Sequence, residues 1–140
     1  MIKITFDRLI DAQFTNGLMK LGGWASCPSS KTKLAIGEIL KHYAIAARDA
    51  DKDLQALINE HCEKNEDGSR KAQKDAPGTF IIPDENEAAW REAVSTVAME
   101  LPCRQLVLSE LADVPLTPME LAAVDVLLND KEVTRLRAAK

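Results

Sequence analysis

Residues 34–57, LAIGEILKHYAIAARDADKDLQAL, decide the fold of this chain. Their apolar residues recur at intervals of four and three positions, the spacing of a helix face that packs on another helix. We call this set the seam; it consists of Ile36, Leu40, Tyr43, Ala47, Ala50, Leu54 and Leu57. Because residues 30–63 contain no proline and only one glycine, Gly37, the spacing predicts one continuous helix there.

The predicted helix is long for its domain. At ~1.5 Å per residue it would span roughly 50 Å, more than the width of a compact domain of this size. The seam therefore needs a cover, from elsewhere in the chain or from a partner, and we expect it to be an interaction surface. Trp24 lies in the loop before the helix, where we expect it to be exposed and to act as a contact anchor.

The segment before the seam predicts a second, shorter helix. Thr5 can cap it, and Gly22 and Gly23 end it. A loop over 24–29 then reverses the chain, so the sequence predicts a long antiparallel helical hairpin. The shorter arm covers only about half of the longer one.

The rest of the chain predicts a polar tip, a small ribbon and two further helices. Residues 64–78 are a polar loop, and the β-prone runs 79–82 and 105–108 are expected to pair as a two-stranded ribbon. Asp84 with Glu87 predicts a capped helix that continues to Leu101. The motif Thr117-Pro118-Met119-Glu120 predicts the start of another helix, and residues 129–140 either extend it or fray. The expected fold is mainly α, with a minor β part, in one domain over residues 1–140.

Composition and charge limit the function classes. The net charge is −4, and acids and bases alternate along the chain, which disfavours nucleic-acid binding. The three cysteines, Cys27, Cys62 and Cys103, form no CxxC pair, as expected for reduced thiols in a cytosolic protein. An acid and a base occur within residues 1–8, where a signal peptide would have its apolar core, so we expect no signal peptide. No apolar run is long enough to cross a bilayer.

One pattern resembles a metal site. An EF-hand calcium loop has oxygen ligands at positions 1, 3, 5, 7 and 12, and this spacing is matched by Asp49, Asp51, Asp53, Gln55 and Glu60. Position 6 needs glycine for a sharp turn, however, and the chain has Leu54 there, which also continues the seam. We therefore reject calcium and interpret these residues as the solvated face of a helix.

The remaining reactive residues do not form a catalytic set. His61 and Cys62 are adjacent on a helix and would point about 100° apart, so they cannot readily share a metal ion. Arg104 next to Cys103 favours a thiolate, but no histidine partner is recognisable. The sequence contains no glycine-rich phosphate loop. We therefore expect no enzymatic activity, no metal and no cofactor.

The order of features provides a resemblance. It is carried by ITFDRLIDA (4–12), INEHCEK (58–64) with EDGS (66–69), FII (80–82), LVLSEL (106–111) and LTP (116–118). This layout resembles a group of small, mostly uncharacterised bacteriophage proteins encoded among virion and tail genes. The resemblance implies a structural or assembly role and carries no catalytic residues.

Two functions fit these observations. The first is a bacteriophage structural or assembly protein, in the virion, tail or connector, that binds itself or other virion proteins through helix packing. The second is a small phage-encoded inhibitor or regulator that binds a host protein. Both would be made in the host cytoplasm, with the virion as a further location for the first, and neither involves a membrane. No residue in the sequence separates them.

Overall fold

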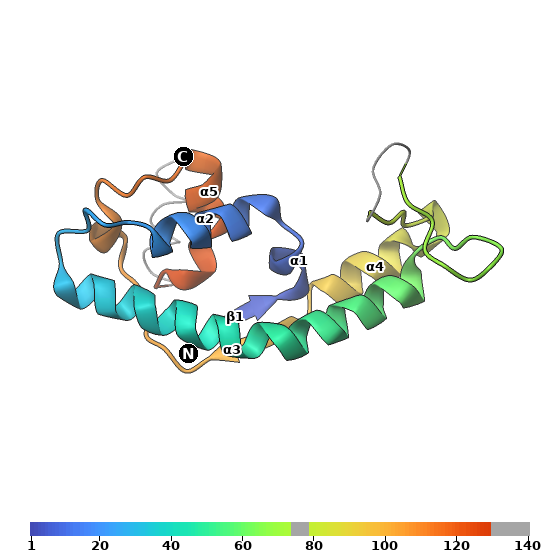
Figure 1. Ribbon diagram of the computed structural model, residues 1–140, viewed down its shortest axis with the longest axis horizontal. Helices are drawn as coiled ribbons and strands as arrows, with labels where there is room; N and C mark the ends of the chain where they lie inside the picture. The colour runs from blue at the N-terminus through green and yellow to red at the C-terminus, as the bar shows by residue number, and fades with distance from the viewer. Residues whose placement is uncertain (74–78, 130–140) are drawn as a thin grey trace.

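The computed structural model describes residues 1–73 and 79–129 of the chain and shows a mainly helical protein (Figure 1). In chain order its elements are β1 (Ile2–Thr5), α1 (Phe6–Leu9), α2 (Ala12–Gly22), α3 (Ser30–His61), η1 (Asp84–Asn86), α4 (Glu87–Val94), β2 (Val97–Leu101), η2 (Leu108–Leu111), α5 (Pro118–Ala123) and η3 (Asp125–Leu127). The α elements are α-helices and the η elements are 3₁₀ turns.

The long helix α3 is confirmed. Ser29 caps it, since its hydroxyl accepts a hydrogen bond from the backbone N–H of Thr32 at 3.2 Å. The helix continues without a break to His61 and extends along most of the length of the molecule (Figure 1). A continuous helix through residues 49–60 also excludes the sharp loop that the calcium interpretation required.

The two-stranded sheet forms from segments that the sequence analysis did not select. β1 pairs antiparallel with β2, with Ile2 opposite Leu101 and Ile4 opposite Met99. These four side chains are buried against the core, whereas Lys3 and Glu100 pair on the exposed face. The alternation is typical of a strand pair with one solvated face, and opposite charges across the pair add to its stability.

The predicted ribbon of 79–82 with 105–108 was wrong. Residues 79–82 form no strand, and Leu106 instead makes an isolated bridge with Leu128. The predicted helix 84–101 was also too long, because α4 ends at Val94. The hydroxyls of Ser95 and Thr96 donate to carbonyl oxygens three residues back and so compete with further helix formation. The chain then enters β2.

Local capping signals had mixed outcomes. The box at Thr117 and Glu120 is confirmed, with reciprocal hydrogen bonds of 3.2 and 2.9 Å. Asp84 instead begins a 3₁₀ turn, and α4 starts after Asn86 without a side-chain cap. The helix expected from Thr5 is split into α1 and α2, and it is Asp11 that caps α2.

The predicted two-helix hairpin is not confirmed as a unit. α2 does contact α3, where Phe14 and Tyr43 form an edge-on ring pair with centroids 6.3 Å apart. Its other face packs on α5, and Lys20 forms an ion pair with Glu120 at 2.7 Å. α2 is therefore a central element between α3 and α5, and not simply the second arm of a hairpin (Figure 1).

Residues 64–73 lie in a loop beyond the end of α3, as predicted (Figure 1). Gly68 has a φ of +86°, which a side chain would disfavour, at the turn between the bridged residues Lys64 and Arg70. The other parts of the predicted tip and tail, residues 74–78 and 130–140, lie outside the described residues.

Two glycines within helices provide a matched stability test. A Cβ on Gly17 would lie 2.7 Å from Cγ1 of Val124, a fully buried and stiff side chain, whereas a Cβ on Gly37 would meet nothing within 4 Å. We expect Gly17→Ala to destabilise the protein by about 1–2 kcal/mol through overpacking. Gly37→Ala should stabilise it by about 0.5–1 kcal/mol, since alanine favours the helix. Urea unfolding of both variants measures the difference; equal effects would contradict the close packing of α2 on α5.

Candidate interaction surface

The inner face of α3 is covered by the chain itself. Of the seam, Ile36, Ala50 and Leu54 are buried, and the other four members, Leu40, Tyr43, Ala47 and Leu57, are half-buried. α2, β2 and α4 each pack against α3. The cover that the sequence analysis required is therefore present within the chain, and the buried seam residues are not accessible to a partner in the folded protein.

The distal half of the seam has its own small core. Leu54 joins an apolar cluster with Phe6 of α1 and Trp90 and Val94 of α4; the cluster also contains Ile58 and Cys62. Trp90 makes an edge-on contact with Phe80, with ring centroids 5.6 Å apart. The half of α3 that the predicted hairpin left uncovered is thus packed by α1 and α4.

Trp24 is buried. The exposed contact role expected for it was wrong, because only 5% of its surface is accessible and it belongs to the main core with Leu21, Cys27 and Ile36. Three further residues of α3 are buried but were not included in the predicted seam: Thr32, Ile39 and Ile58. Ile39 and Ile58 lie three or four positions from seam members, so a wider apolar stripe would have included them.

The outer face of α3 carries exposed apolar side chains. Leu34 is 73% exposed and Ile45 is 66% exposed. They are eleven residues apart, about three turns, so both point to the same side of the helix. A crevice of about 310 Å³ beside Leu34 is lined by Lys31, Glu38 and the segment 102–104. Charged side chains lie between Leu34 and Ile45, so this face offers a partner a mixed apolar and charged surface and not one contiguous apolar patch.

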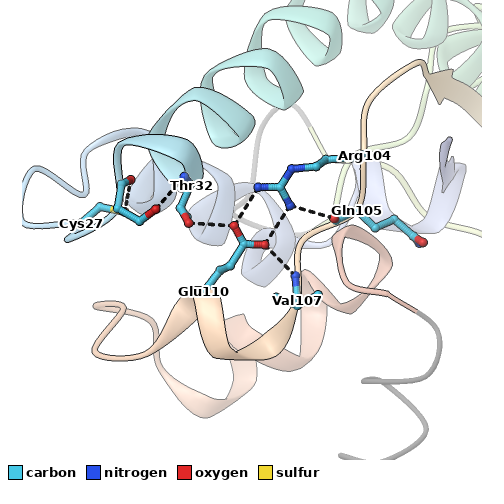
Figure 2. A network of polar contacts seen from close by, with 7 residues as sticks. Cys27, Thr32, Arg104, Gln105, Val107 and Glu110 are labelled. Carbon is cyan, nitrogen blue, oxygen red and sulfur yellow. Dashed lines mark hydrogen bonds and ion pairs between the residues drawn. The ribbon is translucent and has the colours of Figure 1, made fainter.

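A polar network fixes the start of α3 (Figure 2). The Glu110 carboxylate accepts two hydrogen bonds from the Arg104 guanidinium, at 2.8 and 2.7 Å. It accepts two more from the Thr32 hydroxyl at 2.7 Å and the Val107 backbone N–H at 3.0 Å. The network therefore links η2 and the segment before it to the first turn of α3.

The charge state of Glu110 follows from these contacts. The Arg104 hydrogen bonds, helped by those from Val107 and Thr32, lower the pKa of Glu110 from 4.5 to about 2 despite partial burial. A carboxylate with so low a pKa is a weak base, and its lone pairs are already used, so it serves to hold the structure together rather than to transfer protons.

Cys103 and His61 are each placed by contacts with neighbouring residues. Burial and the nearby charge of Glu38 raise the pKa of Cys103, opposite to the effect expected from Arg104, and its Sγ lies 3.6 Å from the carbonyl oxygen of Glu38. The His61 ring lies beside that of Trp90, with ring centroids 5.8 Å apart and the two planes tilted by 59°. Within residues 1–73 and 79–129, no three His, Cys, Asp or Glu side chains could hold a metal ion.

No described helix is both long and apolar enough to cross a membrane. Comparison with known proteins gives no further guide: no family model, no curated protein and no solved structure matches this chain.

Two leucines of α3 test the assignment of its faces. Leu54 is 6% exposed and Leu34 is 73% exposed on the same helix. We expect Leu54→Ala to cost about 2–4 kcal/mol of unfolding free energy, because it leaves a cavity between α3 and α4. Leu34→Ala should change that free energy by less than about 0.5 kcal/mol. Chemical denaturation of both variants provides the measurement, and a similar cost at the two positions would mean that the faces are misassigned.

The Glu110 network predicts a pH-dependent stability. Because the pKa of Glu110 is lower in the folded state than its ordinary value of 4.5, the network stabilises the protein fully above about pH 4.5. This stabilisation is lost as the pH falls toward 2. We expect Glu110→Gln to lower the free energy of unfolding by about 1–2 kcal/mol at pH 7. The difference in unfolding free energy between the variant and wild type should become smaller below pH 4.5. Urea unfolding of both proteins from pH 7 to pH 3 measures this difference. A difference in unfolding free energy that stays constant with pH would contradict the prediction.

Proposed function

We propose that this chain is a bacteriophage structural or assembly protein that acts by protein-protein contact and not by catalysis. The observation that carries the proposal is the outer face of α3, on which Leu34 and Ile45 are exposed along a helix whose other side is packed by the chain itself. The layout resemblance to small phage proteins encoded among virion and tail genes supports the same role.

The packing of α3 suits such a role physically. A surface built on a continuous helix presents its side chains at fixed spacings, so a partner can bind without first ordering a loop. The Glu110 network and the packing of α2, β2 and α4 keep that helix in place. The contact would therefore use the outer face of α3, while the inner seam maintains the fold.

Composition of the phage particle tests the proposal. We expect the chain in purified particles at a fixed copy number relative to the major capsid or tail protein, measured by quantitative mass spectrometry. Infected-cell lysate provides the control, since the chain should also be present in the host cytoplasm during synthesis.

The opposite result would favour the inhibitor hypothesis. A chain absent from purified particles, but recovered from infected cells in a stoichiometric complex with one host protein, would contradict a structural role. It would instead assign the chain as a phage-encoded regulator of that host protein.

A further inference from the structure

One stripe on the outer face of α3 is exposed along nearly the whole helix. We call it the outer stripe; its residues, all exposed, are Lys31, Leu34, Glu38, Lys41, Ile45, Asp49, Lys52, Ala56 and Asn59. Leu34, Ile45 and Ala56 recur every eleven residues, about three helical turns, so they stay on one face with little drift. Ile45 lies at the centre of the stripe.

The stripe is complementary to itself when reversed about Ile45. In an antiparallel pair of helices with its two-fold axis at Ile45, Leu34 of one copy lies opposite Ala56 of the other. The same axis places the two Ile45 side chains against each other. The apolar positions of the stripe thus meet only apolar positions.

The charges of the stripe match under the same operation. Glu38 lies opposite Lys52 of the second copy, and Lys41 lies opposite Asp49 of the second copy, with each pair formed twice by symmetry. Lys31 meets Asn59, next to Glu60. A parallel pair in register would instead place each lysine opposite the same lysine, which like-charge repulsion disfavours. The charge order therefore selects the antiparallel arrangement.

We propose that a second copy of this chain docks on the outer stripe, with the two α3 helices antiparallel about Ile45. This inference rests on the proposed function, protein-protein contact through the outer face of α3, and specifies a second copy of the chain as the partner. Since the inner face of α3 is packed within the chain, both copies keep their folds intact on association. The contact is isologous, so it closes as a dimer.

The pairing is modest in strength and depends on salt. Only Leu34, Ile45 and Ala56 contribute apolar contact, and the exposed ion pairs are weakened by screening. We expect a dimer in the micromolar range, dissociation constant about 10–100 μM at low ionic strength, that weakens about tenfold or more at high salt. Arg48 borders the stripe and would lie near Lys41 of the second copy, so one repulsive contact remains.

Charge reversal on the full chain tests the arrangement by sedimentation equilibrium. We expect Glu38→Lys and Lys52→Glu each to weaken dimerisation about tenfold, and the double variant to restore it, since the pair is then re-formed with opposite signs. Arg48→Glu should strengthen dimerisation, because it replaces the repulsion with an attraction.

Matched controls separate this effect from general changes in charge. Lys33→Glu and Asp51→Lys are exposed reversals on the same helix, about 120° around from Ile45. We expect each to leave the dissociation constant within about twofold of wild type. Circular dichroism melts verify that all variants remain folded.

A cysteine placed on the two-fold axis tests the register. In a Cys103→Ser background, Ile45→Cys should form a disulfide-linked dimer on mild oxidation. The reason is that the Cβ atoms of residue 45 in the two copies would lie within the distance that a disulfide spans. Ala44→Cys, exposed but about 100° around the helix, should not. Cys27 and Cys62 are buried and do not compete.

Three outcomes would overturn the inference: a strict monomer at several hundred micromolar, weakening by both single charge reversals without recovery in the double variant, or equal cross-linking at residues 44 and 45. Any of these leaves the virion assay unaffected, because incorporation into the particle is measured separately. A chain present in particles but monomeric in solution would therefore overturn self-association alone.

Discussion

The structure depends on one constraint: a helix of 32 residues, α3, must bury an apolar face along its whole length. A single helix partner of ordinary length cannot do this. The chain solves the problem in sections, with α2 over the first half, the β1–β2 sheet near the middle, and α1 and α4 over the distal half (Figure 1). These elements are placed by what they cover on α3, whereas α5 packs on the other side of α2.

Polar contacts hold these covering elements in place. Glu110 links η2 to the first turn of α3, and Glu120 links α5 to α2 through Lys20. A hydrogen bond from Lys20 lowers the pKa of Glu120, so both carboxylates remain charged across the physiological range. These hydrogen bonds to charged groups orient segments that lie far apart in the sequence, which apolar packing alone specifies less sharply.

The division of α3 into two faces connects fold with function. The inner face of α3 is buried within the folded chain. A partner that binds without unfolding the protein must therefore contact other surfaces. The outer face of the same helix is exposed and has a mixed apolar and charged pattern. A role in assembly thus places folding and association on opposite sides of one rigid element, where a change in one need not disturb the other.

The sequence by itself determined the features that local chemistry controls. These are the length of α3, the glycine end of α2 and the box at Thr117, since each depends mainly on residues close by in the sequence. Only the tertiary structure decided the rest. Residues 97–101 fit a helix or a strand, and pairing with residues 2–5 at the other end of the sequence chose the strand. The burial of Trp24 and the division of α3 into a buried and an exposed face also depended on the tertiary structure. Burial is set by what packs against a side chain and not by its spacing in the sequence.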